Sequence, residues 1–184
     1  MITGKRGDVS NRTQQNRISV RIGLEDNMKI IFLDVDGVLN CCYTKKRTPN
    51  GFIGVEEENI ARLKQIVDAT GAKIVLVSSW KSMWEKDEAE CDIDAVYLNT
   101  MLKKHGLYIC AKTEDREYDR GHGIKKFLDG IVNGCVESFV ILDDDFFADY
   151  EELGLLPFVV QPSYYKRGLE DCHVDQAIQI LMKE

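Results

Sequence analysis

Residues 30–40 read IIFLDVDGVLN, a short apolar run that passes directly into two carboxylates and a glycine. Four consecutive apolar residues followed by polar ones are typical of a strand that is buried on both faces of a parallel sheet. An aspartate after a strand is often only a turn or helix-cap residue, so this stretch alone leaves a purely structural role open. Other strands that end in the same way would favour a functional site.

Apolar runs of this kind alternate with amphipathic segments along the rest of the chain. We expect strands at Ile30–Leu33, Ile74–Val77, Leu107–Cys110, Phe139–Leu142 and Pro157–Val160, and helices at Glu56–Ala69, Ile93–His105, Ile124–Val132, Phe146–Leu153 and Val174–Met182. Strands that alternate with helices predict an α/β fold with a doubly wound, mostly parallel sheet.

The first 27 residues differ in composition from the remainder. They are rich in Arg, Asn, Gln, Ser and Gly and show little apolar periodicity, which predicts a disordered extension over residues 1–27. A basic arm that contacts RNA is the alternative for this segment. Residues 28–184 have an ordinary length for one domain with its own core.

The chain is acidic, with a net charge of -7 and a pI of about 5.1. Broad, nonspecific nucleic-acid binding is disfavoured, because it depends on neutralising phosphates with basic side chains. The six cysteines form neither a CxxC pair nor a zinc-ligand spacing with histidine. The apolar runs are too short to cross a bilayer, and the polar N-terminus does not look like a secretory leader. We therefore expect a cytoplasmic protein with free thiols and no membrane partner.

Polar or charged residues follow each of the strong expected strands. Ligands of open parallel sheets bind at the carboxyl ends of the strands, so these residues are expected on one rim. They are Asp34, Asp36, Gly37 and Asn40 after the first strand, Ser78, Ser79, Trp80 and Lys81 after the second, Asp143, Asp144 and Asp145 after Leu142, and Gln161, Ser163, Lys166 and Arg167 after Val160.

Carboxylates that share a rim repel one another, and a cation must compensate them. Hard oxygen ligands suit Mg²⁺, which takes one or two carboxylates and keeps several waters. An acidic triplet such as residues 143–145 is by itself common at a solvated helix N-terminus, where negative charge is favoured. Its occurrence together with Asp34 and Asp36, at the ends of separate buried strands, favours a metal site over helix caps.

These motifs, in this order, resemble those of the haloacid dehalogenase (HAD) superfamily. Residues 31–40 are similar to its first motif, a hydrophobic strand followed by DxDGV; residues 74–78 to its second, a strand ending in Ser or Thr; and residues 140–144 to its fourth, a strand ending in paired Asp. More narrowly, DVDGVLN, SSW, an Arg-Gly before a helix, LDDD, Gln161 and Gly168-Leu169 resemble the HAD domains found in or near Swiss army knife RNA repair proteins. The likeness implies a HAD-like Rossmannoid fold from Lys29 onward.

The resemblance implies a phosphatase that forms an aspartyl-phosphate on Asp34. Asp36 would be the general acid/base, because phosphatases of the superfamily carry an aspartate at this position and dehalogenases lack it. Ser78 would donate a hydrogen bond to a nonbridging phosphoryl oxygen. The implied Mg²⁺ ligands are Asp34, the backbone carbonyl of Asp36, Asp143 and Asp144.

The superfamily also places a basic residue before a helix as its third motif. Arg120 is the expected cation, because it precedes the helix predicted at Ile124 and matches the Arg-Gly of the narrower family. Lys112 and Lys125 are the alternatives. Where relatives often carry a Glu near the helix start, this chain has His122-Gly123, and we interpret His122 as an exposed loop residue.

Residues 40–73 and 80–119, where HAD proteins carry caps, are too short for a sizeable cap. We therefore expect a capless or minimally capped domain whose open site admits a bulky substrate, such as a phosphorylated nucleic-acid end or a phosphoprotein. A positive patch on the rim of an acidic protein can steer a polyanion. Substrate contacts are expected from Gly37, Asn40, Ser79, Lys81, Lys45, Lys46 and Arg47, with Lys166 and Arg167 on the same rim.

Several aromatic residues near this rim are candidates for base stacking. They are Tyr43, Trp80, Trp84, Tyr164 and Tyr165. The structural alternative is that the two tryptophans, four residues apart, pack on one helix face, and that the lysine-rich loop is only solvated.

Three other functions stay open. A small-molecule phosphatase, such as a nucleotidase, would use the same chemistry, and a substrate panel separates it from repair of nucleic-acid ends. A HAD-like module that binds phosphorylated partners without turnover is disfavoured, because a retired site need not keep both Asp34 and Asp36. A CheY-like receiver shares the acidic strand ends but fits poorly with the DxDGV order and the late Asp143-Asp144 pair.

Overall fold

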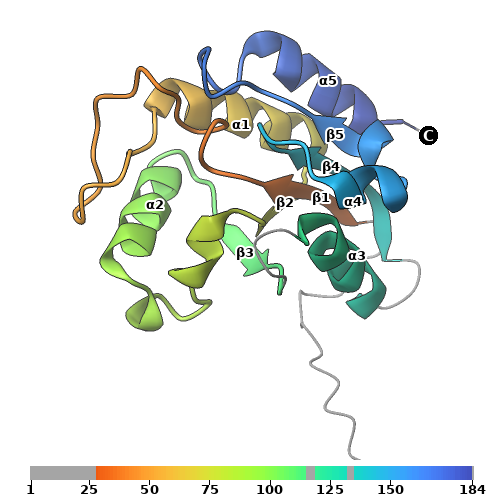
Figure 1. Cartoon of the computed structure of the whole chain (residues 1–184), viewed down its shortest axis with the longest axis horizontal. Coiled ribbons are helices and arrows are strands. Elements are labelled where there is room, and N and C mark those ends of the chain that lie inside the picture. The colour runs from red at the N-terminus through yellow and green to blue at the C-terminus, as the bar shows by residue number, and fades with distance from the viewer. Residues whose placement is uncertain (1–27, 115–118, 132–134, 184) are drawn as a thin grey trace, which may run out of the picture.

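The computed structural model describes residues 28–114, 119–131 and 135–183 (Figure 1). The expected extension over residues 1–27 lies outside these described residues. The strands are β1 Met28–Leu33, β2 Lys73–Leu76, β3 Ile109–Lys112, β4 Val136–Leu142 and β5 Val159–Val160. The α-helices are α1 Glu57–Thr70, α2 Ile93–Lys103, α3 Arg120–Gly130, α4 Ala148–Glu152 and α5 Asp171–Leu181, and the short 3₁₀ helices are η1 Ser79–Ser82, η2 Glu88–Glu90 and η3 Leu156–Phe158.

The described strands form one parallel sheet in the order β3-β2-β1-β4-β5. This confirms the predicted doubly wound α/β fold. Strand β1 occupies the centre, where the strand order changes direction, so Phe32 has Val75 of β2 on one side and Ile141 of β4 on the other. Crevices at such a switch point are the usual ligand sites of open α/β sheets. The topology therefore brings the residues after β1 and β4 together.

Helices cover both faces of the sheet, and Figure 1 shows α1 and α5 on one side with α3 on the other. Alternate β1 residues supply the two cores: Ile31 and Leu33 pack with α1, α2 and α5, whereas Ile30 and Phe32 pack with α3 and α4. All four side chains are completely buried. Burial on both faces explains why this strand reads as a continuous apolar run. Each such side chain contributes about 1.5–3 kcal/mol when removed from water.

Helix α3 begins at Arg120, four residues before the predicted start at Ile124. Two glycines, at 121 and 123, made this segment resemble a loop, since glycine disfavours helix interiors. The helix start is stabilised from outside by Asp149, whose Oδ2 accepts a hydrogen bond of 3.0 Å from the backbone N–H of His122. A Cβ at Gly121 would come 2.8 Å from the Asp149 carboxyl carbon, so this approach requires the glycine. The prediction that Arg120 precedes its helix was therefore wrong: it is the first helical residue.

Other element boundaries also differ from those predicted. Strand β5 contains only two residues, because Leu156–Phe158 turn into η3 before it. Helix α5 begins three residues early, at Asp171, because Glu170 and His173 form a reciprocal capping box. Residues 34–56, between β1 and α1, are a loop with one antiparallel bridge between Arg47 and Ile53. Whether the domain counts as minimally capped stays a prediction. No helix in the described part of the chain has both the length and the apolarity to span a membrane.

Candidate active site

Three of the predicted carboxylates meet at the carboxyl ends of β1 and β4. One oxygen each from Asp34, Asp143 and Asp144 lies within 4.8 Å of the other two. The sheet ladder holds their backbones in place: Asp34 N–H donates to Leu142 O over 2.9 Å, and Asp143 N–H donates to Val160 O over 3.3 Å. Asp34 and Asp143 are buried and Asp144 is half-buried. We call Asp34, Asp143 and Asp144 the carboxylate cluster.

The guanidinium of Arg120 reaches this cluster from the first turn of α3. Arg120 Nη1 lies 2.6 Å from Asp143 Oδ2 and 3.3 Å from Asp34 Oδ2, and the side chain is buried. The ring of Phe147 lies against the guanidinium, 4.4 Å from its central carbon, in a cation–π contact. Burial opposes the charge of Arg120, but the carboxylates of Asp34 and Asp143 together raise its pKa above the ordinary value. Arg120 therefore stays a cation in the site.

The two alternative third-motif cations lie elsewhere. Lys112 Nζ donates to the carbonyl oxygens of Lys81 and Trp84 and pairs with Glu85 at 2.8 Å. Lys125 is exposed and pairs with Asp129 along its own helix at 3.2 Å. Among the three candidates, the structure brings Arg120 into contact with the carboxylate cluster.

The charges of the cluster are not balanced by Arg120 alone. Burial and the neighbouring Asp143 raise the pKa of Asp34 from its ordinary 3.8 to about 7, although Arg120 acts in the opposite direction. Burial, with Asp145 and Asp143 as neighbours, raises the pKa of Asp144 to about 6. Carboxylates with raised pKa values in a shared buried site are stabilised by a bound cation. This set of hard oxygen donors fits Mg²⁺, which prefers such ligands.

Asp36 is held by two N–H donors of its own. The indole Nε1 of Trp80 donates to Asp36 Oδ2 over 2.9 Å, and Asn40 Nδ2 donates to Asp36 Oδ1 over 2.7 Å. Asn40 is itself fixed, because its Oδ1 accepts a bond of 3.0 Å from the Gly37 N–H. Each carboxylate oxygen of Asp36 thus has its own donor, which orients the group.

Gly37 satisfies two requirements at once. Its φ of 77° lies in the left-handed region that side chains rarely adopt. A Cβ built on Gly37 would come 2.0 Å from the Cγ of Asp144, a clash that no small shift relieves. The absence of a side chain therefore lets the turn after β1 pack directly on the second aspartate after β4.

The serines and lysines expected after β2 occupy different environments. Ser78 is buried, and its hydroxyl lowers the pKa of the Asp34 carboxyl. Ser79 is exposed at the start of η1, and Lys81 Nζ donates to Val77 O over 3.4 Å. Ser78 is thus the residue of this segment that contacts the cluster.

The basic residues 45–47 lie on the loop between β1 and α1. Lys46 pairs with Glu56 at 3.5 Å, and Arg47 Nη1 donates to the carbonyl oxygens of Thr44 and Lys46. Lys45 is exposed. Lys46 and Arg47, two of these three residues expected to contact substrate, therefore already have partners within the protein.

The sequence did not predict the residues that hydrogen-bond Asp143 and hold it in place. Tyr150 donates from its hydroxyl to Asp143 Oδ2 over 2.8 Å, and the Asp145 N–H donates to Asp143 Oδ1 over 3.1 Å. Burial and the Asp143 carboxylate raise the pKa of Tyr150, which keeps it a donor. Phe147 and Asp149, described above, belong to the same short segment. The three-aspartate run drew attention to residues 143–145, but nothing in the sequence marks the aromatic residues after it as their partners.

Comparison with protein families gives a match over most of the chain. A family model described as the HAD domain in Swiss Army Knife RNA repair proteins matches residues 30–174. No curated protein and no solved structure matches the chain. The matched range includes all of the residues after β1, β2 and β4 that form the site.

Proposed function

This chain belongs to the family of HAD domains in Swiss Army Knife RNA repair proteins, and we propose that it is a Mg²⁺-dependent phosphatase that acts on phosphorylated nucleic-acid ends. The supporting observation is the division of the site into two parts. The buried carboxylate cluster contacts Arg120, while Asp36 is oriented separately by Trp80 and Asn40. Covalent phosphoryl transfer needs both a nucleophile and a positioned proton-transfer group, and the site offers a carboxylate for each.

In the first step, an Asp34 carboxylate oxygen attacks phosphorus and forms a new P–O bond as the bond to the leaving oxygen breaks. Asp36 delivers its proton to that oxygen, so an alcohol departs and an aspartyl-phosphate is left on Asp34. Arg120 balances negative charge beside Asp34, and Ser78 turns its hydroxyl from Asp34 to a nonbridging phosphoryl oxygen.

In the second step, water attacks the phosphorus of the aspartyl-phosphate. Asp36, now ionised, takes the proton of the attacking water, and the Asp34 carboxylate is released together with inorganic phosphate. Both groups have returned to their starting protonation states. The orientation of Asp36 by two N–H donors serves both steps, because the same carboxyl group faces the leaving oxygen and then the water.

The carboxylate cluster, with the backbone carbonyl of Asp36, would hold Mg²⁺. When bound, the ion neutralises charge on the phosphoryl oxygens. The ion would also stabilise the ionised cluster, because burial and the neighbouring carboxylates raise the pKa values of Asp34 and Asp144.

Phosphate release from p-nitrophenyl phosphate tests this proposal. Wild type, Asp34→Asn and the matched control Asp129→Asn, an exposed helix residue, are compared with Mg²⁺ and with EDTA. Turnover should require both Asp34 and Mg²⁺ and should survive in the control. Turnover that persists in EDTA or in Asp34→Asn would contradict the mechanism.

The alternatives are separated by a substrate panel of phosphorylated oligonucleotides, mononucleotides and sugar phosphates. Efficient hydrolysis of mononucleotides without hydrolysis of oligonucleotide ends would identify a small-molecule phosphatase. Mg²⁺ binding without turnover of any of these esters would identify a phosphate-binding module.

A further inference from the structure

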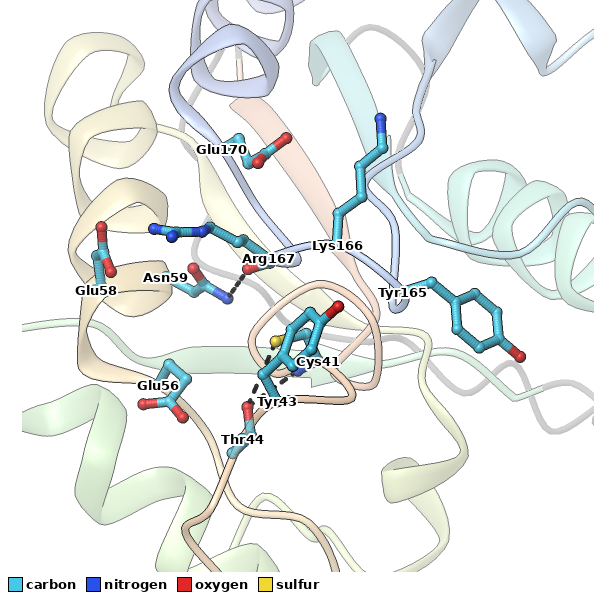
Figure 2. A pocket seen from close by; sticks show the side chains of 10 residues that line it. All are labelled: Cys41, Tyr43, Thr44, Glu56, Glu58, Asn59, Tyr165, Lys166, Arg167 and Glu170. Carbon is cyan, nitrogen blue, oxygen red and sulfur yellow. Dashed lines mark hydrogen bonds between the residues drawn. The ribbon is translucent and has the colours of Figure 1, made fainter.

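A pocket of about 690 Å³ lies beside the candidate active site, between the loop after β1 and the loop before α5 (Figure 2). This volume is within the range of roughly 300–1,000 Å³ that is usual for ligand sites. It is lined by Cys41, Tyr43, Thr44, Glu56, Glu58, Asn59, Tyr165, Lys166, Arg167 and Glu170. We call it the Tyr43–Tyr165 pocket after its two tyrosines.

The pocket wall is continuous with the turn that carries the catalytic aspartates. Cys41 directly follows Asn40, which holds Asp36. The loop before α5 is bonded to the same turn, because Leu169 N–H donates to Val38 O and Cys42 N–H donates to Tyr164 O, both over 2.9 Å. The two loops that form the pocket are therefore joined to the turn that carries Asp34 and Asp36.

Two tyrosines offer exposed rings at this pocket. Tyr43 is 68% exposed and Tyr165 is 80% exposed, and each comes from a different one of the two loops. The two tryptophans that the sequence suggested as stacking residues are instead buried, with Trp80 bound to Asp36 and Trp84 Nε1 donating to Asn99. Of the remaining candidates, Tyr164 is half-buried, with its ring edge-on to that of Tyr165 at 5.4 Å, whereas Tyr43 and Tyr165 are exposed.

The charges around the pocket leave two cations available. Its carboxylates already have partners: Glu56 pairs with Lys46, Glu58 pairs with Arg62 at 2.7 Å, and Glu170 caps α5. By contrast, Lys166 and Arg167 make no ion pair with any carboxylate of the described residues. In Figure 2, Lys166 and Tyr165 extend on the side of the pocket opposite Glu56 and Glu58, whereas Arg167 extends toward the side of Glu58.

We propose that the Tyr43–Tyr165 pocket binds a nucleoside of the phosphorylated strand, with its base against the two tyrosines and backbone phosphates on either side of it at Lys166 and at Arg167. This proposal rests on the proposed function. Aromatic rings beside unpaired cations are the combination that binds single-stranded nucleic acid, because bases stack and phosphates need positive charge. The carboxylates of the pocket can accept hydrogen bonds from exocyclic amines or ribose hydroxyls.

Binding of a fluorescein-labelled, phosphorylated oligoribonucleotide tests the pocket without requiring turnover. Fluorescence anisotropy gives Kd in Mg²⁺ for Asp34→Asn and for the same protein with Tyr43→Ala and Tyr165→Ala added. Loss of base stacking should weaken binding about 10-fold. Adding Tyr108→Ala instead is the matched control, because Tyr108 is also exposed but stands directly before β3, at the opposite edge of the sheet. Removing Lys166 and Arg167 should make the dependence of log Kd on log salt shallower, by roughly 0.7 for each lost phosphate contact.

The possible outcomes separate this proposal from the proposed function. If the double tyrosine variant binds as tightly as the Tyr108 control, the pocket does not hold a nucleoside, and the phosphatase chemistry is unaffected. If affinity for a phosphoserine peptide depends on the tyrosines and the oligonucleotide does not bind, the proposal that the pocket binds a nucleoside is also wrong. If tyrosine-dependent oligonucleotide binding is found while wild type releases no phosphate, the pocket stands and the phosphatase proposal fails.

Discussion

The indole N–H of Trp80 donates to the Oδ2 of Asp36 across 2.9 Å, and so connects the 3₁₀ turn after β2 with the turn after β1. The tryptophan is 4% exposed, so its ring is part of the core while its one polar atom faces the site. A buried donor of this kind orients a carboxylate without offering a competing proton acceptor.

Trp80→Phe removes this donor and keeps most of the ring. We expect kcat/KM for an alkyl phosphate or an oligonucleotide end to fall about 10-fold, because general acid catalysis typically contributes 10²–10⁴-fold and depends on orientation. The loss should be smaller with p-nitrophenyl phosphate, whose leaving group departs without a proton. Trp84→Phe is the control, since Trp84 is equally buried and donates to Asn99 instead. Equal losses on both kinds of ester would show that Trp80 has only a packing role.

Gly37→Ala places a methyl group against Asp144. We expect activity to be lost and Mg²⁺ affinity, measured by calorimetric titration, to fall at least about 10-fold, since the Asp144 carboxylate must move to relieve a 2.0 Å contact. Gly51→Ala is the control, because Gly51 also has positive φ, 90°, but nothing lies within 4 Å of its added Cβ. Both variants carry the backbone strain of about 1 kcal/mol, and only Gly37→Ala carries the clash. Normal Mg²⁺ affinity in Gly37→Ala would exclude Asp144 as a ligand.

Arg120→Ala leaves two buried carboxylates without their cation. Removing one partner of a buried ion pair typically costs about 3–5 kcal/mol, so we expect a large drop in the free energy of unfolding by urea. Added Mg²⁺ should restore part of the loss, because it supplies positive charge to the same carboxylates. Lys125→Ala, at an exposed pair on the same helix, should cost less than about 0.5 kcal/mol. A large loss of activity in Lys125→Ala but not in Arg120→Ala would reassign the third-motif cation.

The raised pKa of Asp34 predicts how stability depends on pH without metal. A carboxyl whose pKa is higher in the folded state binds its proton more tightly there, so the folded state is favoured at low pH and loses that advantage as pH rises from 3.8 to about 7. Relative to Asp34→Asn, the metal-free wild type should therefore become less stable across this range. Mg²⁺ should reverse the trend, because it binds the ionised carboxylate and so binds more tightly at higher pH. A difference in Tm between the two proteins that does not change with pH would contradict the raised pKa.

The fold and the carboxylate cluster could be predicted because they follow from local patterns. The run at Ile30–Leu33 is apolar on both faces, and the parallel sheet places every strand end on one rim, so Asp34 and Asp143 had to approach each other. The start of α3 could not be predicted, because Asp149 stabilises it from another helix. The roles of Trp80 and Tyr150 likewise depend on contacts that form only when distant segments pack.

The order of strands in the sheet also bears on synthesis of the protein. Asp34 leaves the ribosome early, whereas Arg120, Asp143 and Asp144 follow only after most of the domain has been made. Domains fold largely as units, and β1 cannot acquire its neighbour β4 until that late segment emerges. A nascent chain ending before α3 therefore holds Asp34 without Arg120, Asp143 and Asp144, so a truncated product of interrupted translation would lack most of the carboxylate cluster and its cation.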